Sequence, residues 1–79
     1  MRLSDVQLGM TIRIVGFEGG KNLEGKLRQL GILPGDCVTV LRQAPFKGPL
    51  LIESRGREIA LGQGVIAKIT VEGVGCGSH

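Results

Sequence analysis

The sequence predicts a mainly β domain, a small barrel of about five strands with one short helix between the first and second strands. Glycine supplies 14 of the 79 residues, and so many glycines favour tight turns over a helical bundle. Several short stretches alternate apolar and polar residues, as half-buried strands do. Five short strands are too few for a sandwich, whereas a small barrel leaves no exposed sheet edge.

One helix is predicted over residues 23–30. Three leucines repeat there at helical spacing and form the stripe that faces the core: Leu23, Leu27 and Leu30. Asn22 is expected to cap the helix, because its side-chain oxygen can accept a hydrogen bond from a free backbone N–H of the first turn. Gly31 is expected to end the helix in the left-handed conformation, and Ile32 can then fold back onto it.

Three strands follow from the alternation alone, at residues 11–17, 36–42 and 68–72. The side chains that this pattern turns toward the core are Ile12, Ile14, Val38, Val40, Ile69 and Val71. Residues 62–64 contain two glycines and are predicted to form a turn.

Residues 50–54 and 57–61 are predicted to pair as a hairpin. Only a two-residue turn sets their apolar residues opposite each other on one face, and the resulting pairs are Leu50–Leu61 and Ile52–Ile59. That turn requires a positive φ at Arg55. The same register sets Glu53 directly opposite Glu58 on the outer face, where the two carboxylates repel each other. Screening by solvent and nearby arginines is the favoured interpretation, with a bound cation as the alternative.

The inventory of reactive residues argues against an enzyme and against a cofactor. The chain has one histidine, and it is the last residue, so a nucleophile–histidine pair would need that terminus to be held in place. The net charge is only +3, and the basic residues are scattered, which gives little support for nucleic-acid binding. Two phenylalanines with no tryptophan or tyrosine cannot build the stacking surface that single-stranded nucleic acid needs.

Metal binding has three candidate ligands. Cys76 and His79 have the spacing of two ligands, and Cys37 could be a third. Because a structural zinc site takes four ligands, the sequence favours no native metal site. The favoured division is a domain over residues 1–72 and a loosely ordered glycine-rich tail over residues 73–79.

A protein-docking surface is the function that the side chains favour. Phe46 is one of only two aromatic residues, and it lies in a loop rather than at a periodic strand position. Aromatic and arginine side chains dominate interface energetics, at about 2 kcal/mol or more each. The predicted surface consists of Arg28, Leu33, Pro34, Ala44, Pro45, Phe46 and Leu51.

The geometry of this surface stays open at the level of the sequence. The surface draws on two loops, at residues 30–35 and 44–48, which flank the strand predicted at residues 36–42. They therefore lie at opposite ends of that strand or are drawn together by curvature of the barrel. Phe46 has the alternative of plugging the open end of the barrel. Leu51 has the alternative of being covered by the helix.

The sequence also predicts a compartment. No apolar run exceeds three residues, so neither a membrane-spanning helix nor a signal peptide is expected, nor any direct insertion into the membrane. Together with two cysteines far apart in the sequence, this predicts a cytoplasmic protein with reduced thiols.

Motifs spread over residues 3–71 resemble the FeoA family. The most extended is Leu-Arg-Gln-Leu-Gly-Ile-Leu-Pro-Gly at residues 27–35, followed by Val-Thr-Val at 38–40. The other matching segments are Leu-Ser-Asp-Val at 3–6, Ala-Pro at 44–45, Gly-Pro-Leu at 48–50, Arg-Gly at 55–56, Ile-Ala-Leu at 59–61 and Ala-Lys-Ile-Thr-Val at 67–71.

This resemblance implies an SH3-like barrel and a non-enzymatic accessory of ferrous iron uptake. The implied partner is FeoB, a membrane transporter with a cytoplasmic G domain, which would recruit the protein to the inner face of the membrane. A weak homo-oligomer is compatible with this role. An alternative is a metal-responsive module for iron or zinc, similar to the C-terminal domain of iron-dependent repressors. The third alternative is a small nucleic-acid-binding barrel.

Overall fold

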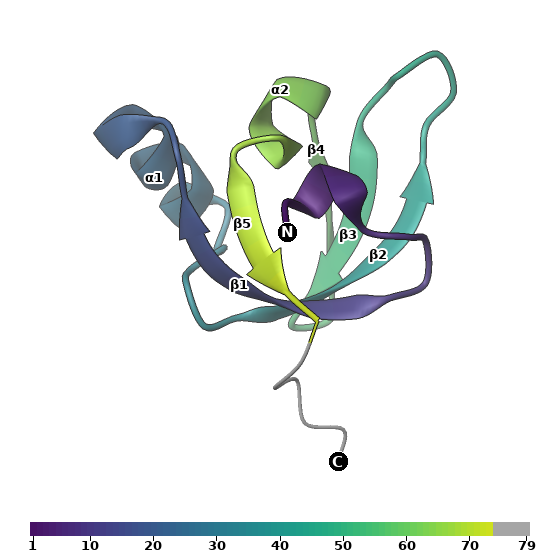
Figure 1. The fold of residues 1–79 in the computed structure, drawn as a ribbon, viewed down its shortest axis with the longest axis horizontal. Helices are drawn as coiled ribbons and strands as arrows, with labels where there is room; N and C mark the ends of the chain where they lie inside the picture. The colour runs from purple at the N-terminus through teal and green to yellow at the C-terminus, as the bar shows by residue number, and fades with distance from the viewer. Residues whose placement is uncertain (74–79) are drawn as a thin grey trace.

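The computed structural model describes residues 1–73, and its five strands form one antiparallel sheet that curls around the core (Figure 1). The order of the strands is β4-β3-β2-β1-β5. The elements are η1 (Leu3–Asp5), β1 (Thr11–Phe17), α1 (Gly20–Gln29), β2 (Cys37–Gln43), β3 (Leu50–Ser54), β4 (Arg57–Leu61), α2 (Gln63–Ile66) and β5 (Ile69–Glu72). The predicted class, mainly β with a helix between the first two strands, is confirmed. Closure is incomplete, because within residues 1–73 no ladder joins β4 to β5.

The core is aliphatic and draws on every strand. All the strand residues predicted to point inward are buried, and η1, α1 and α2 contribute Leu3, Leu27 and Ile66. Val15, which the same alternation turns to the outer face of β1, is 50% exposed. The alternation of apolar residues was therefore a sufficient guide to the inner face of the sheet.

Helix α1 begins earlier than predicted, and its predicted cap is wrong. The N-cap residue is Gly19, which makes no side-chain cap hydrogen bond, and Asn22 lies inside the first turn. Gly19 and Gly20 have φ angles of 129° and 83°. Such angles suit glycine and strain other residues, so this pair turns the chain from β1 directly into the helix.

The end of α1 follows the prediction. Gly31 has a φ of 85°, and the N–H of Ile32 donates to the carbonyl of Leu27 at 2.9 Å. Leu27 and Ile32 are fully buried, while Leu23 and Leu30 pack against the core in part. The predicted leucine stripe is therefore confirmed.

The hairpin of β3 and β4 has the predicted register. Leu50 pairs with Leu61 and Ile52 with Ile59. Arg55 has a φ of 55°, as the two-residue turn requires.

Two short elements were not predicted from the sequence. Residues 62–64, expected to be a turn, run instead into the helix α2, which buries Ile66. The 3-10 helix η1 buries Leu3. Both cover the core where the sheet alone leaves it uncovered.

The two edges of the sheet differ. The β5 edge is covered by the start of the chain, where Arg2 bridges to Thr70 and the carbonyl of Met1 accepts a hydrogen bond from the N–H of Val71 at 2.7 Å. Arg2 is held by an ion pair with Glu18 at 2.8 Å, and the hydrogen bond that its guanidinium donates to the Glu18 carboxylate raises the pKa of Arg2. The other edge is β4, and no strand pairs with its outer side among residues 1–73.

Candidate functional site

The structure separates the predicted docking surface into two grooves. In Figure 1, α1 lies at one end of the longest axis and the loop between β2 and β3 lies toward the other. The loop at residues 30–35, after α1, and the loop at residues 44–48, after β2, therefore lie at opposite ends of β2. Curvature of the sheet does not bring them together.

The first groove, called here the helix groove, lies between α1 and β1 and has a volume of about 290 Å³. It is lined by Gly16, Phe17, Glu24, Arg28, Leu33 and Pro34. Three residues of the predicted surface thus lie together here, with the charges of Glu24 and Arg28 at an otherwise apolar site.

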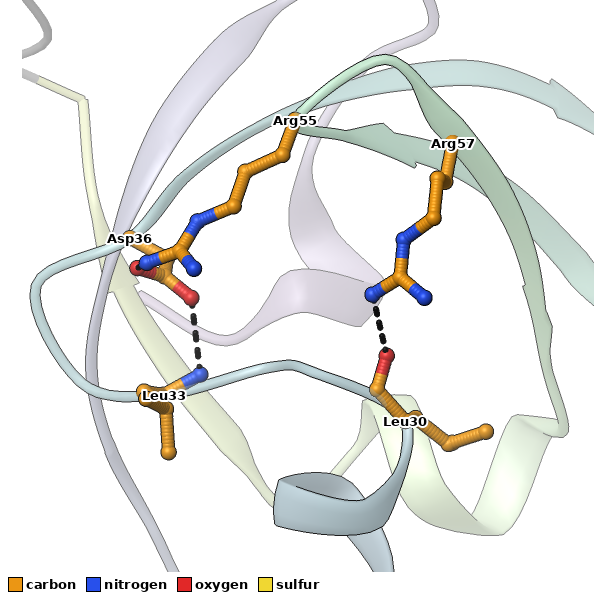
Figure 2. Close-up of polar contacts among 5 residues, drawn as sticks. All are labelled: Leu30, Leu33, Asp36, Arg55 and Arg57. Carbon is orange, nitrogen blue, oxygen red and sulfur yellow. Dashed lines mark hydrogen bonds and ion pairs between the residues drawn. The ribbon is translucent and has the colours of Figure 1, made fainter.

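Polar contacts fix the loop that carries Leu33 and Pro34 (Figure 2). The N–H of Leu33 donates to the Asp36 carboxylate at 2.9 Å, and Arg55 forms an ion pair with the same carboxylate at 2.8 Å. Arg57 donates to the carbonyl of Leu30 at 3.1 Å. The β3–β4 hairpin thus reaches across to brace the end of α1, so the helix groove is preformed.

The second groove, called here the loop groove, has a volume of about 330 Å³. Its lining is mostly apolar and consists of Arg42, Gln43, Ala44, Pro45, Pro49, Leu51 and Ala60. Helix α1 packs beside β1 and does not cover Leu51, so that alternative from the sequence is wrong. Ala44, Pro45 and Leu51, all from the predicted surface, meet here.

Phe46 stands beside the loop groove and is 99% exposed. The alternative that Phe46 plugs the open end of the barrel is therefore wrong. Phe46 and Lys47 have φ angles of 59° and 57°, and the turn is closed by a hydrogen bond from the Gly48 N–H to the Pro45 carbonyl at 3.1 Å. Left-handed backbone at two consecutive non-glycine residues is strained, and such strain clusters at functional sites.

Two glutamines brace this strained loop. The side-chain amides of Gln43 and Gln63 both donate to the carbonyl of Gly48, at 2.6 and 2.9 Å. Sequence reasoning missed both residues. Gln43 ends a strand and so looked like a loop residue, and Gln63 lies in the helix that the glycines concealed.

The metal candidates do not form a site in the described part of the chain. Cys37 begins β2 and is the only one of the three candidate ligands that lies within residues 1–73. Cys76 and His79 lie outside the described residues, as does most of the predicted tail. Residues 1–73 contain no group of three or more histidine, cysteine, aspartate or glutamate residues that could hold a metal ion.

Within the same residues, no helix is long and apolar enough to span a membrane.

Comparison with known proteins identifies the family. The sequence model of the FeoA domain matches residues 1–73. The fold is similar to a solved iron uptake regulatory protein (FeoA), with a TM-score of 0.81 and 31% identity over 90% of this chain and 92% of that one. It is also similar to iron(II) transport protein A from Clostridium thermocellum, with a TM-score of 0.86 and 31% identity over 94% of this chain and 46% of that one.

A further similarity, to ScaR with bound Cd²⁺, has a TM-score of 0.84 and 22% identity over 94% of this chain and 35% of that one; at this identity it shows the fold alone. The domain match covers every strand and helix described above, and the solved FeoA structure is covered almost end to end. On this evidence the chain belongs to the FeoA family.

Proposed function

We propose that this protein is a non-enzymatic accessory of ferrous iron transport that docks on the cytoplasmic part of a FeoB-type transporter. The observation that carries the iron-transport role is the FeoA domain match over residues 1–73. The relatives at 31% identity are described as an iron uptake regulatory protein and an iron(II) transport protein, which supports the same role.

The docking surface is the loop groove together with Phe46. A fully exposed aromatic side chain on a strained, braced turn costs stability and contributes nothing to the core, which favours a binding role. The groove beside it presents Pro45, Pro49 and Leu51 as an apolar floor. The helix groove, with Arg28, Leu33 and Pro34, is the second contact in this proposal.

Docking affects transport only if the protein binds two states of the transporter with different affinity. Because the transporter's cytoplasmic part carries a G domain, its nucleotide state is the natural variable. The proposed mechanism is a shift of that nucleotide state, or of the gate coupled to it, by state-dependent contacts.

The test is the affinity of the purified protein for the transporter's cytoplasmic domain, measured by calorimetry with GDP and with a nonhydrolysable GTP analogue. Phe46→Ala is expected to weaken binding by about 2 kcal/mol, roughly 30-fold, as an aromatic anchor does. Val15→Ala removes apolar surface from an exposed position of β1 and is the matched control. Arg28→Ala reports on the helix groove separately. Failure of the unmodified protein to bind in either nucleotide state would contradict the proposal.

A metal-responsive role is the second candidate, since a domain of the same fold occurs in ScaR, which was solved with bound Cd²⁺. Titration of the purified protein with Fe²⁺ or Zn²⁺ distinguishes the two. Stoichiometric binding that changes the fold or its stability in the absence of the transporter would support the metal-responsive role.

A further inference from the structure

We propose that the open edge of β4 receives an extended segment of the partner as a sixth strand. That segment carries an apolar side chain and a basic side chain two residues apart. The inference deepens the docking proposed above and rests on it for the identity of the partner alone.

The first support is the direction of the backbone groups of β4. In a two-residue hairpin the residues that flank the turn exchange hydrogen bonds, and hydrogen-bonded pairs then alternate along the ladder. Counting from the pair Ser54–Arg57, the N–H and C=O groups of Glu58 and Ala60 point away from β3. Both residues are exposed, and within residues 1–73 no hydrogen bond uses these groups.

The two edges of the sheet differ in whether another segment covers their backbone groups. The N-terminal segment covers β5, with a backbone hydrogen bond to Val71 and the guanidinium of Arg2 on the Ala67 carbonyl at 2.8 Å. On β4 no such cover exists in the described part of the chain. Unpaired strand edges are the sites at which extended peptides add to sheets.

The second support is charge. Glu53 and Glu58 are directly opposite each other in the ladder, which places their side chains on one face at about 5 Å between Cβ atoms. Both are exposed, and neither forms an ion pair within residues 1–73. A lysine or arginine on an added strand, opposite Glu58, would neutralise this repulsion.

The third support is the position of the loop groove. Ala60 is on the same face as Glu58, two residues along the strand, and it lines the loop groove with Leu51, its ladder partner. A residue of the added strand opposite Ala60 therefore places its side chain at the mouth of the groove. In an antiparallel addition the incoming sequence reads apolar, any residue, basic.

A second copy of this chain fits the edge less well than such a partner. Pairing two β4 strands about Ile59 would set Glu58 opposite Ala60 of the copy. Each carboxylate would then face the apolar groove of its neighbour, and the repulsion between Glu53 and Glu58 would remain in both copies. Charge complementarity therefore favours a basic partner segment.

The probe is the synthetic peptide Thr-Thr-Leu-Thr-Lys-Thr-Thr, compared with the same peptide carrying glutamate in place of lysine. Binding to the ¹⁵N-labelled protein is followed by amide chemical shifts and by hydrogen exchange at Glu58 and Ala60. The lysine peptide is expected to bind about tenfold more tightly than the glutamate peptide, since one attraction becomes one repulsion. It is also expected to protect both amides.

Two variants sharpen the test. Glu58→Lys is expected to invert the preference between the peptides. Ala60→Pro removes an N–H that points away from the ladder, a position where an edge strand tolerates proline, and it is expected to abolish binding. The result that would overturn the inference is an unchanged preference in Glu58→Lys, or shifts that map away from β4. Protection of the same amides by self-association would also overturn it, because the occupant would then be a second copy.

The result of the peptide experiment can be separated from that of the docking experiment, because the peptide experiment uses no transporter. If Phe46→Ala loses transporter binding and Ala60→Pro keeps it, the docking proposal stands and the strand addition is refuted.

Discussion

Truncation of Leu27 to alanine tests the packing of α1 against the sheet. Leu27 is fully buried, and its carbonyl also accepts the hydrogen bond from Ile32 that ends the helix. Removing a buried leucine side chain costs about 2.7–5.0 kcal/mol, depending on how far the surroundings collapse. Alanine preserves helix propensity, so we expect a loss of about 3 kcal/mol.

The size of the domain makes this loss large. A chain of 79 residues has a free energy of unfolding of roughly 4–12 kcal/mol. Its unfolding entropy near the midpoint is about 0.17 kcal/mol per kelvin, so 3 kcal/mol lowers the melting temperature by about 18 °C.

The assay is urea denaturation at 25 °C together with calorimetric melting of both proteins. Lys26→Ala, at the exposed neighbouring position, is the control and is expected to leave stability within about 0.5 kcal/mol. A melting temperature equal to that of the parent would show that Leu27 is not packed as described, and the assignment of the inner face of α1 would fall with it.

Three further substitutions test local geometry, each by urea denaturation. Ser54→Ala is expected to stabilise the protein by about 1 kcal/mol, because the buried hydroxyl has no partner within residues 1–73; a loss of stability would reveal a hidden hydrogen bond. Phe46→Gly is expected to be up to about 1 kcal/mol more stable, since relief of the left-handed backbone outweighs the added freedom of the unfolded chain, and yet to bind the transporter poorly. Destabilisation would mean that the Phe46 side chain packs on the domain. Gly31→Ala is expected to cost about 1–2 kcal/mol, because the φ of 85° strains any residue with a Cβ, and the added Cβ would also displace the Arg57 guanidinium. Arg57→Ala should then add less in that background than alone, and strict additivity would contradict the contact.

The hairpin shows why so much of the fold could be predicted. A strand shifted by one residue would turn Ile52 and Ile59 to the outside, so the apolar pattern permits only one pairing even though Arg55 must adopt an unfavourable φ. The end of α1 was predictable for a similar reason, since Gly31 and Ile32 form a local signal that does not depend on the rest of the chain.

The two helical segments that were not predicted correctly, the start of α1 and the whole of α2, were missed for the same physical reason. Glycine permits a turn but also permits the start of a helix, so Gly19 and Gly20 concealed the beginning of α1, and Gly62 and Gly64 concealed α2. In both places tertiary packing, of Leu23 and of Ile66, outweighs local preference.

The candidate site was predictable in its residues but not in its shape. Each member of the predicted surface lines a groove or stands beside one. The separation into two grooves depends on the path of β2, which lies between the two loops. The sequence shows that the loops flank this strand but not how far apart the folded strand holds them. The bracing by Gln43 and Gln63 depends on contacts between side chains distant in sequence, which no local pattern reveals.

The central position of β1 has a consequence for how the chain folds during synthesis. β1 is the first strand to be made, but it lies between β2 and β5, and β5 is the last. A nascent chain that still holds residues 69–72 in the ribosome therefore exposes one side of β1 and leaves Ile14 and Phe17 without their partners Val71 and Ile69. Pairing between strands so distant in sequence is slow, and unpaired strands promote aggregation until it is complete. The domain is thus expected to reach its native state only after residues 69–72 have left the ribosome, which makes its yield in the cell sensitive to chaperones that hold the early strands apart.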